Sequence, residues 1–280
     1  MKLLLIPWLF FLSSCGHLFF QPSKEQFSTP EKYKIKYSSL YFNSLDGTKL
    51  HAWVLKNASL KKPKSTIIFF HGNAENLSSH FLNLAWLTRY GHDIFVFDYR
   101  GYGKSEGTPD QKGAHMDGLA ALEQAYHHHK EVGSEKFIVY GQSLGGIISL
   151  RALAEFKHRS EVTLLVQDST FSSYKSIAFD KLKEYWPTWP LSPLAYILVS
   201  DSYSSKDFAK LISPTPILVI HGLHDQVVPF KNGKKLFDLA SSPKWMWEIE
   251  NGIHTDVFLL HGFRYRRKFL KFLEELPPRT

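Results

Sequence analysis

Short apolar runs recur along most of the chain and alternate with longer segments in which polar and apolar residues mix. Each run holds four or five residues rich in Ile, Val, Leu and aromatic side chains, so each predicts a buried strand. The predicted strands are Thr66–Phe70, Ile94–Phe97, Phe137–Tyr140, Leu164–Gln167, Ile217–Ile220 and Trp245–Ile249. The segments between them predict helices over residues 74–89, 110–131, 144–156, 231–240 and 257–276. This alternation indicates a mostly parallel sheet with helices on both faces.

A hairpin pattern precedes these strands. Leu40–Phe42 and Leu50–Leu55 flank Asp46-Gly47, a dipeptide typical of tight hairpin turns. The predicted fold class is therefore α/β, with an antiparallel pair at the N-terminal edge of the sheet. At 280 residues, of which 44% are hydrophobic and 21% charged, the chain has a globular composition and can bury one large core.

An aromatic and proline-rich insertion follows the predicted strand that ends at Asp168. It predicts a small helical cap over about residues 171–208. Because ligands of open α/β sheets bind at the carboxyl ends of the strands, the cap is expected to lie over the site. Its apolar side chains suit an acyl chain or another apolar group of a substrate. The alternative is that they only pack the cap onto the rest of the domain.

The N-terminus carries a segment of a different kind. Leu3–Leu12 is a run of ten almost wholly apolar residues. It fits the core of a signal peptide and is shorter than the roughly 20 residues that span a bilayer. Leu12-Ser13-Ser14-Cys15 resembles a bacterial lipobox, whose cysteine is lipidated. We therefore predict a signal peptide over residues 1–14, a lipid on Cys15 and a tether over residues 15–36.

A lipid on Cys15 would make the protein a membrane-anchored lipoprotein of the cell envelope. The alternatives are a secreted or periplasmic form and an uncleaved anchor that runs to Phe20. Cys15 is the only cysteine, which excludes an internal disulfide. The formal net charge is +8, but the basic residues are scattered. This distribution favours a solvated surface or attraction to anionic lipid over nucleic-acid binding.

Ser143 is the candidate nucleophile. It sits in Gly141-Gln142-Ser143-Leu144-Gly145, directly between a predicted strand and a predicted helix. In that context Gly-x-Ser-x-Gly places the serine on a sharp turn with its hydroxyl exposed. The helix that follows presents free N–H groups to a developing negative charge.

Asp225 and His254 are the candidate acid and base. A serine hydroxyl needs both, because it is a weak nucleophile at neutral pH. Each follows one of the last two predicted strands, and the order Ser, Asp, His is that of α/β-hydrolases. Asp168 is an alternative acid, and His221, His224 and His261 are alternative bases.

The chain resembles the α/β-hydrolases, within the serine-hydrolase group that holds monoacylglycerol lipases, carboxylesterases and protein depalmitoylases. The motifs that carry the resemblance are Phe70-His71-Gly72-Asn73-Ala74, Asp98–Ser105, the serine turn, and His221-Gly222-x-x-Asp225-x-x-Val228-Pro229. The resemblance implies an α/β-hydrolase domain over residues 37–280. It also implies an oxyanion hole formed by the backbone N–H groups of Asn73 and Leu144.

Other motifs indicate no further chemistry. Gly101-x-Gly103 follows a strand, but Glu106 stands where a dinucleotide fingerprint needs its third glycine. His127-His128-His129 has no surrounding pattern of metal ligands and falls near a predicted helix end, where histidine is favourable. We therefore expect no metal and no organic cofactor.

The predicted function is that of a serine hydrolase that cleaves a carboxylic ester or thioester of a small or lipid-like substrate. Ser143 would attack the acyl carbon, His254 would carry the proton, and Asp225 would orient His254. A serine peptidase or an acyltransferase would use the same residues. The alternative from another class is a binding protein that keeps the fold without catalysis.

Overall fold

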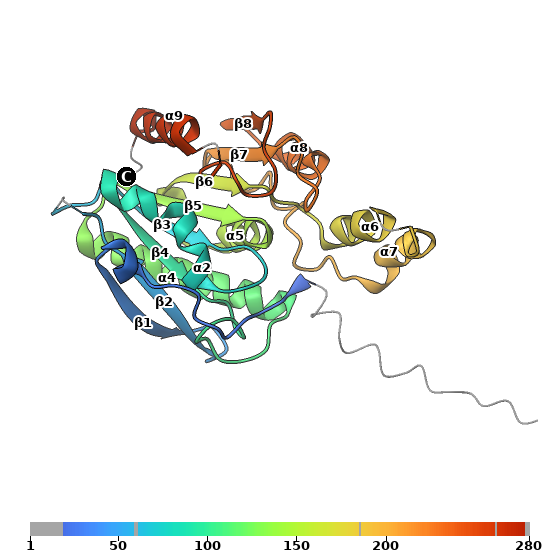
Figure 1. Ribbon diagram of the computed structural model, residues 1–280, viewed down its shortest axis with the longest axis horizontal. Helices are drawn as coiled ribbons and strands as arrows, with labels where there is room; N and C mark the ends of the chain where they lie inside the picture. Colours follow the sequence, from blue (N-terminus) through green and yellow to red (C-terminus); the bar gives the residue numbers. More distant parts are fainter. Residues whose placement is uncertain (1–18, 59–60, 185, 261, 278–280) are drawn as a thin grey trace, which may run out of the picture.

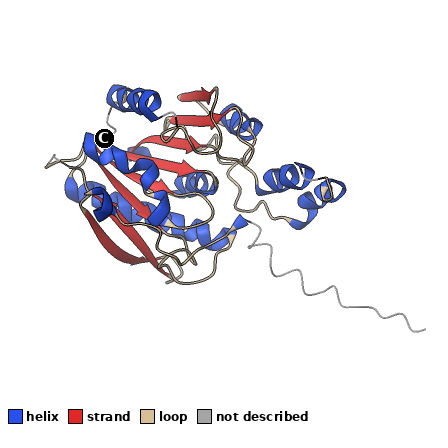
Figure 2. Cartoon of the chain, in the orientation of Figure 1, coloured by secondary structure: helices blue, strands red, loops and turns tan. Residues whose placement is uncertain are grey.

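An eight-stranded sheet runs through the centre of the protein (Figures 1 and 2). The computed structural model describes residues 19–58, 61–184, 186–260 and 262–277. The strands are β1 (Tyr37–Asn43), β2 (Lys49–Leu55), β3 (Ser65–Phe70), β4 (His92–Phe97), β5 (Lys136–Gln142), β6 (Val162–Asp168), β7 (Ile217–Gly222) and β8 (Lys244–Ile249). Their order in the sheet is β1-β2-β4-β3-β5-β6-β7-β8.

Strand directions agree with the prediction. β2 is antiparallel to both β1 and β4, and every other neighbouring pair is parallel. Every residue of β3, β4, β6 and β7 is buried, as near-continuous apolar runs in a covered parallel sheet require. Because β5, β6, β7 and β8 are parallel, their carboxyl ends meet along one edge of the sheet. The predicted strands and the antiparallel edge are confirmed.

Helices cover both faces. Apolar side chains of α4 (Gln111–Val132), α5 (Leu144–Glu155) and α8 (Phe230–Leu239) join the core on one face. Those of α9 (Gly262–Glu275) and of the short helices between β3 and β4 join the core on the other. At the start of α4, the Asp110 side chain accepts a hydrogen bond from the Gly113 amide. At its end, Gly133 caps the helix with φ +63°, a conformation that glycine adopts readily.

The helix predicted over 74–89 is broken into α2 (Leu77–His80), α3 (Leu82–Ala85) and η3 (Trp86–Tyr90). Ala74 and Glu75 have φ of +62° and +52°, so the helix starts only after them. The side chain of Asn76 then accepts a hydrogen bond from the Ser78 amide and caps the first turn. Similarly, the helix predicted over 257–276 begins only at Gly262.

The cap stands at the carboxyl ends of the strands, as expected (Figure 1). It consists of α6 (Tyr174–Glu184), η5 (Trp189–Leu194) and α7 (Ala195–Leu198). At its base, Asp201 accepts hydrogen bonds from Ser173 and Lys206, and Asp180 pairs with Lys231 of α8. Phe171 and Tyr174 are buried, whereas Trp186 and Ile197 are 79% and 77% exposed. Some aromatic residues of the insertion therefore pack the cap onto the rest of the domain, and others are exposed to solvent.

The segment before β1 packs against the domain, which corrects the predicted tether over its described part. Residues 19–36 include η2 (Pro30–Tyr33), and Phe20 is 1% exposed. The Ser23 amide donates to the Glu75 carbonyl at 3.1 Å, and the Gly103 amide donates to the Ser23 carbonyl at 2.9 Å. These backbone hydrogen bonds hold residues 19–36 against the hydrolase domain, so this part of the predicted tether is not a free linker.

The predicted signal peptide over residues 1–14 and the lipidation residue Cys15 lie outside the described residues. Across the parts of the chain that the structure describes, no helix combines the length and apolar character needed to cross a membrane.

Candidate active site

Ser143 lies at the junction between β5 and α5. Its backbone has φ +52° and ψ −117°, a strained conformation that lifts the side chain out of the sheet. The two flanking glycines allow this turn. A Cβ on Gly145 would lie 2.0 Å from the Phe70 carbonyl oxygen, and one on Gly141 would lie 2.2 Å from Ser149 Oγ. Neither position accepts a larger residue without movement of its neighbours.

Asp225 and His254 reach Ser143 from the loops after β7 and β8. The distance from Asp225 Oδ2 to His254 Nδ1 is 2.8 Å, and that from His254 Nε2 to Ser143 Oγ is 3.0 Å. An ionised carboxylate only accepts, so Nδ1 carries the proton and Nε2 of a neutral ring accepts from the serine hydroxyl. The three residues singled out from the sequence therefore form one hydrogen-bonded chain.

The carboxylate of Asp225 is held from several sides. Its Oδ1 accepts hydrogen bonds from the amides of Val227 and Val228, each at 2.8 Å. His221 Nε2 lies 3.4 Å from Oδ2. Burial raises the pKa of Asp225, but the hydrogen bonds from His221, His254 and the backbone outweigh it and leave the pKa well below its usual value. Asp225 is therefore ionised and fixed in orientation.

The rival candidates have other partners. Asp168 accepts hydrogen bonds from Tyr140 Oη at 2.8 Å and Ser169 Oγ at 3.0 Å, and its backbone carbonyl accepts from the Ser143 amide at 2.8 Å. It supports the serine turn. His221 Nε2 also bonds the Val228 carbonyl at 2.8 Å, within the loop that carries Asp225. His261 lies outside the described residues.

Asn73 and Leu144 line the same cavity as Ser143. Leu144 is the first residue of α5, so its amide has no acceptor within the helix. The loop that carries Asn73 comes close to the serine, because a Cβ on Gly72 would lie 3.5 Å from Ser143 Cβ. The predicted oxyanion donors therefore lie on the two segments that flank Ser143.

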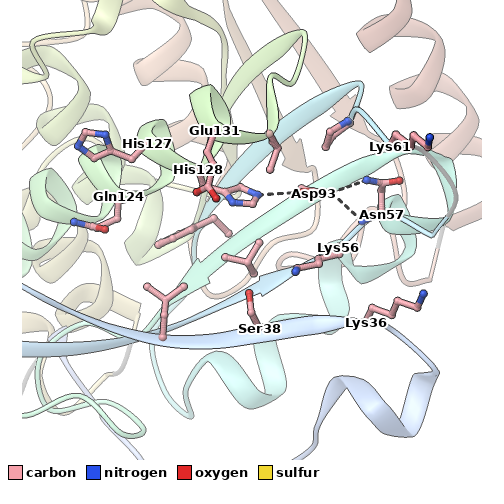
Figure 3. Close-up of a pocket in the computed structure, with 15 residues that line it drawn as sticks. Lys36, Ser38, Lys56, Asn57, Lys61, Asp93, Gln124, His127, His128 and Glu131 are labelled. Carbon is pink, nitrogen blue, oxygen red and sulfur yellow. Dashed lines mark hydrogen bonds and ion pairs between the residues drawn. The ribbon is translucent and has the colours of Figure 1, made fainter.

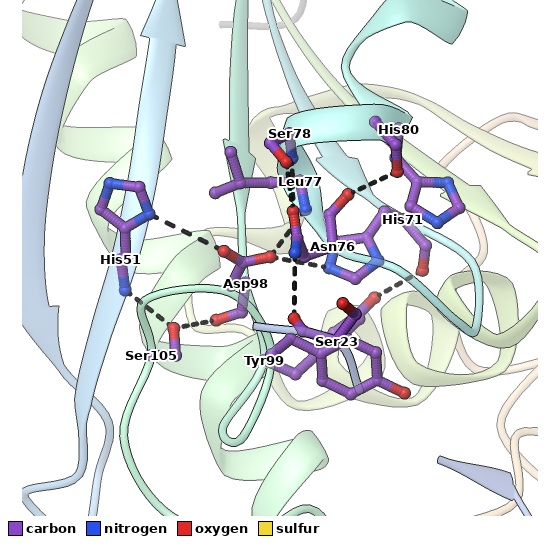
Figure 4. Close-up of polar contacts among 12 residues, drawn as sticks. Ser23, His51, His71, Asn76, Leu77, Ser78, His80, Asp98, Tyr99 and Ser105 are labelled. Carbon is purple, nitrogen blue, oxygen red and sulfur yellow. Dashed lines mark hydrogen bonds and ion pairs between the residues drawn. The ribbon is translucent and has the colours of Figure 1, made fainter. Parts of the chain in front are cut away.

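A buried carboxylate that sequence reasoning missed holds this loop (Figure 4). Asp98 Oδ1 accepts a hydrogen bond from the Leu77 amide at 2.7 Å, and it lies 3.5 Å from His71 Nε2. On the other side, Asp98 Oδ2 lies 3.7 Å from His51 Nδ1. Burial raises the pKa of Asp98, but interactions with His51 and His71 outweigh it and lower the pKa. The sequence marked Asp98 only as the first residue of the Asp98–Ser105 motif, directly after β4, and gave it no role.

The cavity beside Ser143 has a volume of about 260 Å³ and is mostly apolar. It is lined by Phe19, Asn73, Ser143, Leu144, Phe171, Ile177, Ala178, Lys181, Leu182, Val227 and Val228. The cap and the loop after β7 supply most of the apolar walls. Lys181 of the cap also donates to the Gln226 carbonyl at 2.7 Å, which fastens the cap to the loop of Asp225.

A larger cavity of about 500 Å³ lies near the amino-terminal end of β4, at the opposite end of the sheet (Figure 3). Asp93 at its wall accepts hydrogen bonds from the Asn57 amide at 2.8 Å and from His128 at 3.0 Å. Three lysines, Lys36, Lys56 and Lys61, line the same cavity. Asp93 lies in β4, so its bond with His128 fastens α4 to β4 and its bond with Asn57 fastens the loop after β2 to the same strand. We therefore assign Asp93 a structural role.

The three consecutive histidines bind three separate partners. His127 lies 3.2 Å from Glu123, His128 pairs with Asp93, and His129 Nδ1 bonds Ser134 at 2.5 Å. Their side chains therefore point to different neighbours.

Comparisons with known proteins agree with the observed fold. A family model described as "alpha/beta hydrolase fold" matches residues 65–190. The protein YfhR of Escherichia coli (strain K12) is 35% identical over 238 residues, with 84% of this chain and 80% of YfhR covered. The membrane protein YNL320W of Saccharomyces cerevisiae is 30% identical, with 87% and 82% covered. A solved structure, the Pyrococcus furiosus esterase Pf2001, superposes with a TM-score of 0.74 at 19% identity, covering 92% of this chain and 98% of the esterase.

Proposed function

The chain belongs to the α/β-hydrolase family, and we propose that it is a serine hydrolase that cleaves a carboxylic ester or thioester. The single observation that supports this most is the continuous hydrogen-bonded chain from Asp225 through His254 to Ser143, whose end opens on an apolar cavity. A binding protein would gain nothing from a strained serine aligned with a histidine and a buried, ionised carboxylate.

The proposed reaction forms and breaks an acyl-enzyme on Ser143. His254 Nε2 takes the hydroxyl proton as Ser143 Oγ attacks the acyl carbon. The carbonyl oxygen becomes an oxyanion, which the amides of Asn73 and Leu144 stabilise. When the intermediate collapses, the bond to the leaving oxygen or sulfur breaks and His254 donates the proton to it. Asp225 stays ionised throughout and stabilises the imidazolium.

Water completes the cycle. It attacks the acyl carbon of the acyl-enzyme while His254 removes one of its protons. Collapse of the second intermediate releases the carboxylic acid and returns the proton to Ser143 Oγ. The chemistry needs only side chains and backbone amides of this chain.

An apolar acyl group suits the cavity best. Phe171, Ile177 and Leu182 line it, and its volume of about 260 Å³ lies just below the usual range for drug-sized ligands. The structural neighbour Pf2001 is an esterase, which supports an ester as the substrate. A small apolar cavity also gives an acyl chain a water-free place to bind.

Labelling with a fluorophosphonate tests the nucleophile. The wild type should be labelled and Ser143→Ala should not. Among the residues that the structure describes, Ser143 alone combines a hydrogen bond to a histidine with two candidate amide donors. Ser38→Ala is the matched control, since Ser38 lines the distant cavity. Equal labelling of Ser143→Ala would overturn the assignment. Activity on p-nitrophenyl esters of increasing length, set against a peptide substrate, separates an esterase from a peptidase.

We also propose that the protein acts at a membrane through a lipid on Cys15. A relative in yeast is called a membrane protein, which supports membrane association in general. Cys15→Ser should leave an unprocessed precursor, and mass spectrometry of the mature N-terminus would read the modification directly. An unmodified Cys15, or cleavage beyond it, would contradict the proposal.

A further inference from the structure

The segment before β1 reaches the candidate active site. Phe19 lines the cavity beside Ser143 although it lies outside the predicted hydrolase domain. Its side chain is 9% exposed, and its ring meets that of Tyr174 edge to face at 5.0 Å between centroids. Tyr174 in turn packs against Phe171 of the cavity wall, with centroids 5.7 Å apart. Phe19 is therefore part of the same apolar layer as the cap.

The next residues of the segment contact the loop of Asn73. The Gln21 amide donates to Asn73 Oδ1 at 2.9 Å, and Tyr102 Oη donates to the same oxygen at 2.8 Å. Burial raises the pKa of Tyr102, so the phenol keeps its proton and remains a donor. The side-chain oxygen of Asn73 is thus held by two donors, one of which belongs to the N-terminal segment.

The segment is fastened to the far end of the same loop. The Ser23 amide bonds the Glu75 carbonyl at 3.1 Å, and Asn76 Nδ2 donates to the Ser23 carbonyl at 2.9 Å. Between these contacts lie Ala74 and Glu75, both with positive φ. Non-glycine residues hold such a backbone only where surrounding contacts enforce it. The segment supplies several of those contacts.

We infer that residues 19–23 are a working part of the active site: Phe19 sets the acyl chain length that the cavity accepts, and the Gln21 amide positions the Asn73 oxyanion donor. This inference rests on the proposed function, because it assigns roles toward an acyl group and an oxyanion. Phe19 is a specificity-determining residue, and Gln21 is a positioning residue that acts through Asn73.

Substitutions at Phe19 test the cavity wall. With p-nitrophenyl esters from acetate to dodecanoate, Phe19→Ala should raise kcat/KM for the longest esters relative to acetate by about tenfold, because a phenyl ring leaves the wall. Phe19→Trp should shift the preference to shorter chains. Phe27→Ala is the matched control, since Phe27 is on the same segment and does not line the cavity. An unchanged chain-length profile for Phe19→Ala and Phe19→Trp would overturn the inference.

A pair of substitutions at Gln21 tests the positioning role. Gln21→Pro removes the backbone donor, whereas Gln21→Ala keeps it and loses only the side chain. Gln21→Pro should lower kcat about tenfold for every ester, with little change in KM or in the pH profile set by His254. Because Gln21→Ala keeps the backbone donor, its loss of kcat should be smaller than that of Gln21→Pro. Equal kinetics for the two variants would contradict positioning through the amide.

The two proposals fail in different ways. If the wild type is neither labelled by fluorophosphonate nor active on any ester, the proposed function fails. If the wild type is labelled and active, and both Phe19→Ala and Phe19→Trp are labelled with the wild-type chain-length profile, only the inference fails. Fluorophosphonate labelling of each variant also shows that its serine site is folded, so a lost activity is not mistaken for a changed preference.

Discussion

Asp168 and Asp225 are buried at the carboxyl ends of neighbouring strands, but their pKa values are shifted in opposite directions. Asp225 follows β7 and accepts hydrogen bonds from two backbone amides and a histidine. Asp168 ends β6 and accepts from the hydroxyls of Tyr140 and Ser169. In both, burial acts to raise the pKa, and in Asp225 alone do the hydrogen bonds reverse the effect. A carboxylate orients a catalytic histidine only if its surroundings keep it ionised, so the proposed function assigns that role to Asp225 and not to Asp168.

The largest test of this comparison is activity. Asp225→Asn should lower kcat by about 10⁴, because the amide would favour the wrong tautomer of His254 toward Ser143. Asp168→Asn should keep kcat within about tenfold, since Asp168 supports the serine turn rather than the histidine. Steady-state kinetics on one p-nitrophenyl ester measures both. If Asp168→Asn lowers kcat more than Asp225→Asn does, Asp168 rather than Asp225 orients the histidine.

The contributions of Asp225 and Asp168 to the free energy of unfolding should change with pH in opposite directions. The lowered pKa of Asp225 means that its carboxylate stabilises the fold above the unfolded pKa, and that this contribution is lost as pH falls through the folded pKa. The pKa of Asp168 is raised, so its ionisation opposes folding as pH rises above the unfolded value. Asp225→Asn should therefore cost most stability at neutral pH, and Asp168→Asn should cost least there.

Urea unfolding at several pH values between 3 and 8 would check this. For each variant the quantity to plot is its free energy of unfolding minus that of the wild type. The two curves should slope in opposite directions. Parallel curves would mean that the two carboxylates do not differ in their protonation within the folded protein.

The smallest expected effect concerns the hydroxyl that bonds Asp168. Tyr140→Phe removes the 2.8 Å hydrogen bond and leaves a buried acceptor short of a partner. Such a change typically costs about 1–3 kcal/mol of stability. The pKa of Asp168 should rise further, while kcat should change little. Thermal unfolding and ester kinetics on the same preparation would show whether stability and activity separate as expected.

The strands and the three aligned residues could be predicted because they depend on local pattern. Apolar runs bounded by turn residues mark buried strands, and parallel strands bring the loops after β5, β7 and β8 to one edge. Ser143, Asp225 and His254 each follow one of these strands. These three residues lie close together because the strands that precede them are parallel, and the apolar runs predict those strands.

The N-terminal segment and the loop of Asn73 could not be predicted in the same way. Gln21-Pro22-Ser23-Lys24 reads as a linker, because its packing depends on hydrogen bonds to residues about 50 or more positions away, such as Asn73. The positive φ of Ala74 and Glu75 likewise comes from tertiary contacts, so propensity favoured a helix there. Local sequence does not encode contacts of this range.

Asp98 carries a consequence for the order of folding. Its carboxylate lies among His51 of β2, His71 after β3 and the Leu77 amide, so it joins segments that meet only when three strands have paired. Such pairings close long loops and form slowly. During refolding, the loop of Asn73 reaches its final geometry only after this part of the sheet assembles. Recovery of activity should therefore lag behind recovery of secondary structure.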